Sequence, residues 1–145
     1  MENSKKEENL IMIIWAQALV AMLGSLFYSE IMGYTPCEMC WYQRILMYPL
    51  VIIYGAYAFG KRKSREQLIP GMIMSGIGLL VAIYHYMIQK VPAFHEAGGA
   101  CGIVPCNAVY VNYLGFITIP FMAAVAFAVI FILTIVLYKK KGRVA

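Results

Sequence analysis

The sequence predicts an all-α integral membrane protein, a bundle of four transmembrane helices with two extracytoplasmic cysteine-bearing loops and both termini in the cytoplasm. Hydrophobic residues make up 62% of the 145 residues and charged residues only 13%, which is more apolar than a soluble domain of this size can bury. Four apolar segments are long enough to cross the hydrocarbon layer, which takes about 20 residues of helix. Basic residues gather on one side of these segments and give the bundle its predicted orientation.

The four predicted helices follow one another along a chain that is expected to form a single domain, residues 1–145, because no linker or repeat divides it. They cover residues 10–28, 41–59, 68–88 and 113–138. Backbone groups in hydrocarbon must hydrogen-bond to one another, so each segment should be helical. The first is expected to be a retained anchor, because only about six apolar residues precede its small-residue pattern. Gly71, Ser75 and Gly78 share one face of the third segment and allow close helix packing.

Ten of the 12 basic residues lie before the first segment, between the second and third, or after the fourth. They are Lys5, Lys6, Lys61, Arg62, Lys63, Arg65, Lys139, Lys140, Lys141 and Arg143. The positive-inside rule therefore places both termini and the middle loop in the cytoplasm. Topology and attraction to anionic lipid account for these short clusters, which are poor evidence for nucleic acid binding.

All four cysteines fall in, or at the edges of, the two loops that are expected outside, residues 29–40 and 89–112. They are Cys37, Cys40, Cys101 and Cys106. An extracytoplasmic compartment permits disulfides, so two pairs on that face indicate either redox chemistry or structural bridges.

The first cysteine pair is predicted to open the second helix. Thr35 is expected at the N-cap, Pro36 at the first helical position, and Glu38 three residues after the cap to close a capping box. Cys37 would then lie in the first turn and Cys40 just beyond it. The partial positive charge at a helix N-terminus favours thiolate over thiol, so the pair is predicted to be reactive.

Two ionisable side chains inside the predicted helices are candidate ligand contacts. Arg44 follows Cys40 by four residues on the same helix face, where it can lower a thiol pKa or donate hydrogen bonds to a bound carbonyl oxygen. The alternative is that Arg44 reaches out to the lipid headgroups. His85 lies near the outer end of the third helix, in the same leaflet, so the two side chains are candidates to flank one pocket. A helix-to-helix hydrogen bond is the alternative role for His85.

The second cysteine pair lies in the stretch "GGACGIVPCNA", residues 98–108, which is rich in glycine and contains Pro105. Such a loop can fold back far enough to bridge Cys101 and Cys106, and its mobility leaves the bridge open to an incoming thiolate. A static clip that stiffens the loop is the alternative. Exchange between disulfides needs a second pair within reach, which favours the redox interpretation here.

Several motifs together resemble the DsbB family, the disulfide bond formation proteins B, which are thiol:quinone oxidoreductases. The resemblance covers nearly the whole chain: "PCEMCWYQR" at the start of the second helix, "YHYMIQ" near the end of the third, and "YLGFITIP" at the predicted start of the fourth. The short Cys-x4-Cys loop resembles the BdbC branch of Gram-positive bacteria. Gln43 stands where better-known members often carry an acid.

The resemblance implies a path for electrons. A reduced, extracytoplasmic thioredoxin-like dithiol oxidase, similar to DsbA or BdbD, would attack the Cys101–Cys106 bridge at Cys101. Cys106 would then attack Cys37 and release Cys40 as the thiolate that donates to a membrane quinone. Arg44 and His85 match the quinone-contacting positions of the family. A Gram-positive setting favours menaquinone over ubiquinone as the cofactor, and the protein would reside in the bacterial cell membrane, where it supports disulfide formation in secreted proteins.

Other classes of protein remain alternatives at this stage. The two cysteine pairs, with His95 nearby, offer enough ligands for a structural zinc site, although the predicted redox site contains no metal. A membrane scaffold or a small transporter subunit with static disulfides is another. The vitamin K epoxide reductase-like enzymes share the bundle and the chemistry, but their Cys-x-x-Cys lies late in the bundle and their loop pair early, the reverse of the order in this chain.

Overall fold

The computed structural model describes residues 1–99 and 102–144, so the predicted site residue Cys101 lies outside the described residues. The helices are α1 (Glu2–Leu26), the π-helical turn η1 (Phe27–Ile31), α2 (Glu38–Phe59), the 3-10 turn η2 (Arg65–Gln67), α3 (Leu68–Lys90), α4 (Pro92–Gly99) and α5 (Ile119–Val144). Within the described residues the only β-type pairing is an isolated bridge between Tyr113 and Ile117. The prediction of an all-α fold is therefore confirmed for the part of the chain that is described.

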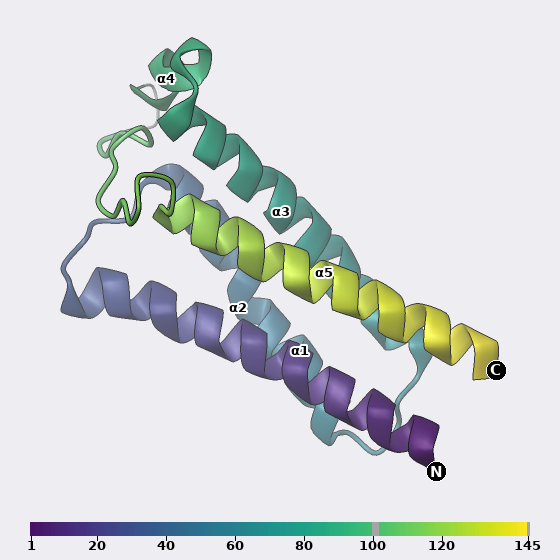
Figure 1. Ribbon diagram of the computed structural model, residues 1–145. Helices are drawn as coiled ribbons and strands as arrows, with labels where there is room; N and C mark the ends of the chain where they lie inside the picture. The colour runs from purple at the N-terminus through teal and green to yellow at the C-terminus, as the bar shows by residue number, and fades with distance from the viewer. Residues whose placement is uncertain (100–101, 145) are drawn as a thin grey trace.

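The four long helices α1, α2, α3 and α5 pack side by side (Figure 1). Helix α3 packs against α2 and α5, and α1 packs against the same two helices, so the four enclose a common core. Both termini and the α2–α3 connection lie at one end of the bundle (Figure 1). Residues 32–37 and 102–118 lie at the other end, where α4 continues beyond α3. The cysteine-bearing segments thus share the end opposite the termini.

Three helical segments are long and apolar enough to cross a membrane, judged by length and composition: Glu2–Ile31, Arg65–Lys90 and Ile119–Arg143. Helix α2 has 22 residues and is not one of these three segments. It contains the polar residues Glu38, Tyr42, Gln43, Arg44, Tyr48, Tyr54 and Tyr57. The chain is therefore a membrane protein, and α2 is the long helix whose composition least supports a membrane span.

A stripe of small and polar residues along α3 forms the centre of the bundle. The buried residues of α3 recur at intervals of three and four: Leu68, Gly71, Ser75, Gly78, Ala82, His85 and Ile88. The predicted packing face of Gly71, Ser75 and Gly78 is confirmed, since all three are buried. A methyl group at Gly78 would overlap the ring of Phe127 on α5, so the glycine lets α3 and α5 approach closely. The same stripe carries His85 to the outer end of the core.

Hydrogen bonds tie α2 to α5 inside the core. The Tyr54 hydroxyl and the Thr134 Oγ1 are 2.7 Å apart, and Thr134 also donates to the carbonyl oxygen of Ile130 at 2.6 Å. Both side chains are fully buried, so the hydrogen bonds offset the cost of placing their hydroxyls away from water. The outward faces instead expose large apolar side chains such as Val20, Ile52 and Leu80, as expected for contact with lipid.

The observed start of the last long helix differs from the prediction. Helix α5 begins at Ile119, whereas the predicted segment began at residue 113. Residues 113–118 instead form a tight turn, in which Leu114 and Gly115 have positive φ values of 55° and 83°. Lys90 at the end of α3 donates to the carbonyl oxygen of Gly115 at 2.8 Å and holds this turn in place. Apolar composition marked the segment as helical, but backbone conformation at two residues decided otherwise.

The predicted capping box of α2 is wrong. The N-cap residue is Cys37, with an extended backbone, and no side chain caps the helix there. Glu38 is the first helical residue, and its carboxylate accepts a hydrogen bond from the Tyr42 hydroxyl at 2.6 Å instead of closing the box. Thr35 and Pro36 stay outside the helix. The consequence for the site is that Cys40, and not Cys37, occupies the first turn.

Glycine-to-alanine variants test the role of the close α3–α5 approach. We expect Gly78→Ala to lower the free energy of unfolding by about 1–3 kcal/mol, because the added methyl group has no space beside Phe127. Gly24→Ala in α1 is the matched control, since a methyl group there meets no atom within 4 Å. Denaturant titration in micelles, followed by circular dichroism, measures both. Equal stability of the two variants would contradict the packing described here.

Candidate functional site

The first cysteine pair lies where α2 begins, with one sulfur buried and the other half-buried. Cys37 precedes the helix and Cys40 ends its first turn, so the three-residue spacing brings both side chains to one face. The Cys37 thiol donates a hydrogen bond to the Cys40 sulfur, with the two Sγ atoms 3.3 Å apart. The predicted Cys-x-x-Cys contact is therefore present, as a hydrogen-bonded pair.

The two thiols of this pair are not equivalent. The hydrogen bond to Cys40 and burial together raise the pKa of Cys37 to about 12. Cys37 thus keeps its proton when the pair loses one, and Cys40 carries the negative charge. The prediction that the helix N-terminus favours the thiolate does not hold for Cys37, because its thiol donates a hydrogen bond to the Cys40 sulfur.

The second cysteine pair reaches the first through Cys106. Its side chain is fully buried and packs in one cluster with Cys37 and Ile88. The backbone N–H of Cys106 donates to the carbonyl oxygen of Gly98 at 2.9 Å. A side chain at Gly98 would collide with Ile88 and with the backbone that follows Cys106, so this glycine lets the loop close over α3. Loop and helix together bring a third sulfur-bearing residue to the first pair.

His85 lies between the two cysteine-bearing segments. Its Nε2 atom is 3.1 Å from the carbonyl oxygen of Cys106 and 3.6 Å from the Cys37 Sγ. Its Nδ1 atom is 3.0 Å from the side-chain nitrogen of Gln43 on α2. The ring is 1% exposed, so all of its polar contacts are internal. Of the predicted site residues, Cys37, Cys40, Cys106 and His85 are therefore brought together.

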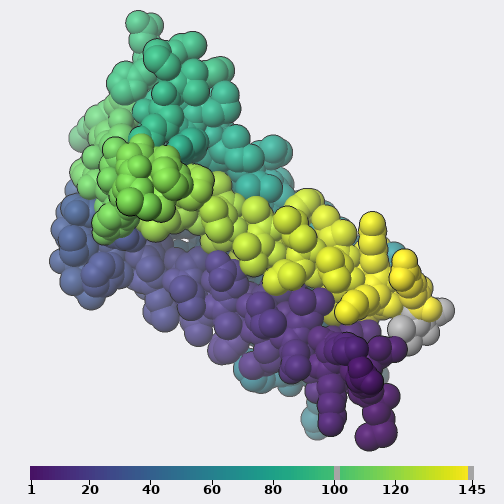
Figure 2. Space-filling view, in the orientation of Figure 1, coloured from purple at the N-terminus to yellow at the C-terminus, as the bar shows by residue number. Residues whose placement is uncertain are grey.

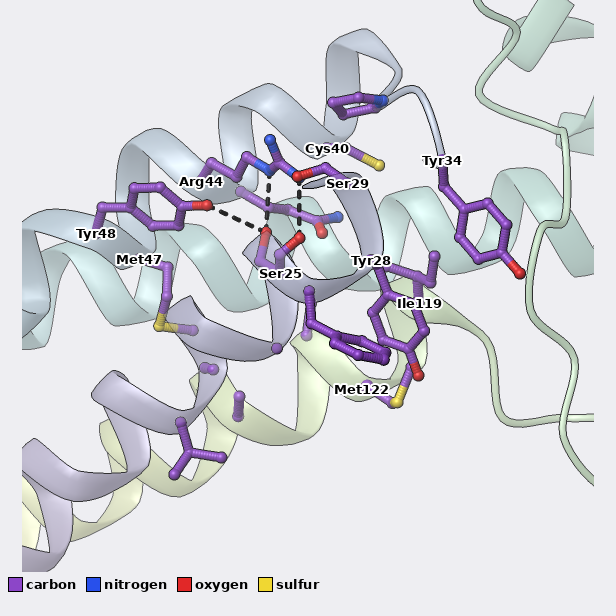
Figure 3. Close-up of a pocket in the computed structure, with 18 of the residues that line it drawn as sticks. Ser25, Tyr28, Ser29, Tyr34, Cys40, Arg44, Met47, Tyr48, Ile119 and Met122 are labelled. Atoms are coloured by element: carbon purple, nitrogen blue, oxygen red, sulfur yellow. Dashed lines mark hydrogen bonds between the residues drawn. The ribbon is translucent and has the colours of Figure 1, made fainter. Parts of the chain in front are cut away.

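A cavity of about 440 Å³ opens beside Cys40 and is lined by residues of α1, η1, α2, α5 and the loops. Figure 3 shows Cys40, Arg44 and Tyr48 on one wall of this cavity and Ile119 and Met122 of α5 facing them. Most of the lining side chains are apolar. The space-filling view shows a hollow between α1 and α5 close to the loop end (Figure 2). We refer to this space as the α1–α2–α5 cavity.

Arg44 is held at the polar side of the α1–α2–α5 cavity by α1. Its Nε donates to the Ser25 hydroxyl at 2.9 Å and its Nη2 to the Ser25 carbonyl oxygen at 3.1 Å (Figure 3). The guanidinium also lies over the Trp41 ring, 5.4 Å from its centroid. Arg44 therefore points into the bundle toward α1. Its half-buried side chain shares the cavity with Cys40, as the sequence spacing predicted.

Three tyrosines stack at the loop end of the cavity. The rings of Tyr28 and Tyr34 are 6.1 Å apart and tilted by 11°, and those of Tyr34 and Tyr110 are 5.1 Å apart and tilted by 12°. Tyr28 belongs to the π-helical turn η1, which widens the end of α1. Each tyrosine lines the cavity. The stack thus connects the first helix to both loops and forms one end of the cavity.

Sequence reasoning missed two partners in this site. Ser25 carries the hydrogen bonds that orient Arg44, and Gln43 carries the one to His85. The available signal in both cases was a small or polar residue inside an apolar helix, where an unpaired polar group is costly. His85 itself does not line the α1–α2–α5 cavity, because the cysteine pair and Gln43 lie between them. Its contact with a quinone stays a prediction.

The donor atoms also bear on the zinc alternative. The sulfur atoms of Cys37 and Cys40 and a ring nitrogen of His85 lie within 4.8 Å of one another, which is a geometry that could hold a metal ion. His95, the histidine that the sequence suggested, uses its carbonyl oxygen to accept a hydrogen bond from Asn107. The group of candidate donors found among the described residues contains His85, and His95 is not part of it.

Comparisons with known proteins agree with this arrangement. A family model described as "Disulfide bond formation protein DsbB" matches residues 7–137. A protein of Oceanobacillus iheyensis named "Probable disulfide formation protein" is 60% identical over 143 residues, 98% of this chain and 97% of its own. The "Disulfide bond formation protein C" of Bacillus subtilis is 48% identical over 130 residues, 89% of this chain and 92% of its own. No solved structure matches the chain. With the cysteine pair, the loop cysteine and a matching family model, this chain belongs to the DsbB family of disulfide bond formation proteins.

Proposed function

We propose that this protein is a thiol:quinone oxidoreductase that reoxidises an extracytoplasmic thioredoxin-like dithiol oxidase and passes the electrons to a membrane quinone. One observation carries the proposal. The first cysteine pair has Cys37 packed against Cys106 and Cys40 exposed to an apolar cavity that also contains a cation, Arg44. The pair has another cysteine, Cys106, on one side and a cavity of ligand size on the other. This arrangement is suited to passing electrons from a thiol to a bound small molecule.

The reaction begins at the loop and balances over four thiol–disulfide exchanges. A partner thiolate attacks Cys101, breaks the Cys101–Cys106 bond and releases the Cys106 thiolate. Cys106 then attacks Cys37, breaks the Cys37–Cys40 bond and releases the Cys40 thiolate. The second partner thiol displaces Cys101, and Cys101 attacks Cys106, which restores the loop disulfide and releases Cys37. The partner is now oxidised, and the first pair holds two electrons.

The final step re-forms the Cys37–Cys40 disulfide. The dithiol gives two electrons and two protons to the quinone, which leaves as the quinol. Cys40 is the sulfur next to the substrate, because it faces the cavity while Cys37 is buried against the loop. The shared proton of the pair stays on Cys37, so the negative charge already lies on the cavity side.

The α1–α2–α5 cavity is the proposed quinone site. Its volume falls within the range of about 300–1,000 Å³ that small-molecule sites occupy. The Arg44 guanidinium can donate to a quinone carbonyl oxygen and stabilise the charge that develops there on reduction. The hollow between α1 and α5 offers a lipid-soluble molecule a route from the bilayer (Figure 2). Relatives from Bacillus and Oceanobacillus support the BdbC-like branch, for which we propose menaquinone rather than ubiquinone.

The proposed topology has four spans, with α2 as the second. Basic clusters lie at the end that contains both termini, where Lys141 of α5 donates to the Lys63 carbonyl oxygen at 2.8 Å and lies 3.9 Å from Glu7 of α1. The positive-inside rule supports a cytoplasmic location for that end. The cysteine-bearing loops then face the extracytoplasmic side, where a secreted thioredoxin-like partner can reach them.

Replacement of Cys40 tests the proposed reaction. We expect the parent protein, mixed with a reduced thioredoxin-like dithiol protein and a quinone analogue, to bleach the quinone absorbance. Cys40→Ser should lower that rate to the level without protein while circular dichroism stays unchanged, because the sulfur beside the cavity is gone. Equal rates in variant and parent would refute the proposal. Metal analysis of the same preparation is the control, since stoichiometric zinc released by thiol oxidants would favour the structural zinc site instead.

Two substitutions at Arg44 test the quinone site. We expect Arg44→Ala to raise the KM for the quinone analogue about 10-fold or more, because the variant loses one hydrogen bond from a charged donor to the quinone. The KM for the partner protein should change much less, because Arg44 lies on the cavity side of the cysteine pair. Arg44→Lys keeps the charge and should give an intermediate KM. Unchanged quinone kinetics in Arg44→Ala would rule out this role.

The raised pKa of Cys37 predicts which thiol reacts first with an alkylating agent. Only the thiolate reacts, and the ordinary pKa of a cysteine is about 8.5. Because the pKa of Cys37 is about 12, its alkylation should be slow at pH 8 and should accelerate as the pH rises toward 12, while Cys40 is alkylated first. Peptide mass spectrometry of the reduced protein measures both rates. In Cys40→Ala the main cause of the shift is removed, and Cys37 should react at lower pH. Equal rates for the two thiols at pH 8 would contradict the asymmetry.

A further inference from the structure

Gln43 and His85 form a buried hydrogen-bonded couple that links α2 to α3. Gln43 is 6% exposed and His85 is 1% exposed. The amide nitrogen of Gln43 and the Nδ1 of His85 are 3.0 Å apart. On its other side the same ring reaches the Cys37 sulfur at 3.6 Å and the Cys106 carbonyl oxygen at 3.1 Å. Through the His85 ring, this hydrogen-bonded pair of side chains contacts both cysteine-bearing segments.

The hydrogen-bond partners define the state of the imidazole ring. A backbone carbonyl oxygen only accepts, so the Nε2 atom that faces the Cys106 carbonyl must carry a proton. In the neutral ring Nδ1 is then an acceptor, and the Gln43 side chain supplies the N–H that it needs. Gln43 thus stabilises the tautomer that the Cys106 carbonyl requires, in which the donor nitrogen points toward the two cysteines.

The Nε2–H of His85 has two acceptors within reach, and each belongs to a different redox pair. The Cys106 carbonyl comes from the loop pair, and the Cys37 sulfur is the atom that Cys106 attacks in the proposed reaction. A second amide, the Nε2 of Gln89, donates to the same Cys106 carbonyl at 3.4 Å and to the Ala108 carbonyl at 3.1 Å. The loop is therefore fixed to α3 at the residue whose sulfur must approach α2.

We propose that Gln43 is a positioning residue: it holds His85 in the Nε2–H tautomer, and His85 in turn holds Cys106 in register with Cys37 for the transfer of the disulfide from one pair to the other. The inference rests on the proposed function, and it deepens the exchange between the pairs. In that exchange the Cys106 thiolate forms a bond to the Cys37 sulfur, the Cys37–Cys40 bond breaks, and Cys40 leaves as a thiolate. The step is electron-balanced and needs no added oxidant or proton.

This role accounts for a glutamine at position 43. A glutamine presents an N–H to Nδ1 without adding charge beside the cysteine pair. A side chain of similar length without an N–H donor, such as methionine, would leave Nδ1 buried without a donor and remove the support that Gln43 gives to the Nε2–H tautomer. A glutamate carboxylate only accepts, so it pairs with the ring when Nδ1 is also protonated; the resulting imidazolium keeps Nε2–H in place, and the carboxylate balances its charge. Methionine and glutamate therefore separate loss of the hydrogen bond from a change of side-chain type.

The alignment of the two pairs can be measured without a quinone. In the full chain carrying Cys40→Ser and Cys101→Ser, Cys37 and Cys106 remain as the two cysteines and can form only the inter-pair disulfide. Equilibration in glutathione buffers gives their effective concentration. We expect Gln43→Met to lower it about 10-fold or more, as misplacement of reacting groups does, and Gln43→Glu to restore it to within about threefold. An unchanged value in Gln43→Met would overturn the proposal, as would failure of Gln43→Glu to restore it.

Nitrogen NMR of the imidazole ring supplies a readout that a purely structural role would not change. The chain has two histidines, so His95→Gln leaves His85 as the only labelled ring. We expect the parent signals of a neutral ring protonated at Nε2, and loss of that single tautomer in Gln43→Met, with a folded circular dichroism spectrum as control. A ring protonated at Nδ1 in the parent, or the same tautomer in Gln43→Met, would overturn the proposal.

The two tests separate this inference from the proposed function. Neither measurement contains quinone, so a protein that aligns its pairs through Gln43 but reduces no quinone would refute the proposed function alone. A parent that reduces quinone at full rate, with an effective concentration that Gln43→Met leaves unchanged, would refute the positioning role alone.

Discussion

The hydrogen bond from the Cys37 thiol to the Cys40 sulfur gives the first cysteine pair two different sides, and the rest of the site depends on it. Cys37 keeps a proton and packs against the loop that carries Cys106. Cys40 borders the α1–α2–α5 cavity together with Arg44. Because the pair begins a helix, a single turn of backbone separates the sulfur that packs against the cysteine loop from the sulfur that faces an apolar space. The proposed electron transfer would run between these two sides.

The packing of the helices around α2 places different surroundings on the two sides of the cysteine pair. Small residues on α3 let α5 approach closely, and the same stripe ends in His85 and Ile88 beneath the cysteine loop. On the other side of α2, the end of α1 widens into a π-helical turn whose Tyr28 faces the cavity. Close packing between α3 and α5 and the cavity between α1 and α5 thus place the cysteine cluster next to an open apolar space, which is the proposed quinone site.

Much of the bundle could be predicted from the sequence, since apolar segments, small-residue spacing and cysteine positions are local signals. The segments 10–28, 41–59 and 68–88 lie within observed helices. The capping box of α2 and the start of the last helix were not predictable in this way. The Glu38 carboxylate accepts a hydrogen bond from the Tyr42 hydroxyl and does not cap the helix. The turn after residue 113 depends on positive φ values and on a hydrogen bond from Lys90 of α3.

The sequence indicated which residues belong to the site, but it indicated their relative positions only in part. Arg44 and Cys40 share a cavity because their four-residue spacing on one helix fixes their relative positions. The place of His85 depends on how α3 packs against α2, and its partner Gln43 is 42 residues away in the sequence. Tertiary hydrogen bonds of this kind leave no local pattern, although a polar residue within an apolar helix marks where one must form.

The proposed reaction requires a quinone to bind beside Cys40, between α1, α2 and α5. Photocrosslinking with a light-activated quinone analogue in membranes, followed by peptide mapping, tests it most directly. We expect adducts on peptides that contain Met47 and Met122, which line the cavity from α2 and α5, and we expect unlabelled quinone to suppress them. Adducts confined to α3 and α4, or adducts that excess quinone does not suppress, would contradict it.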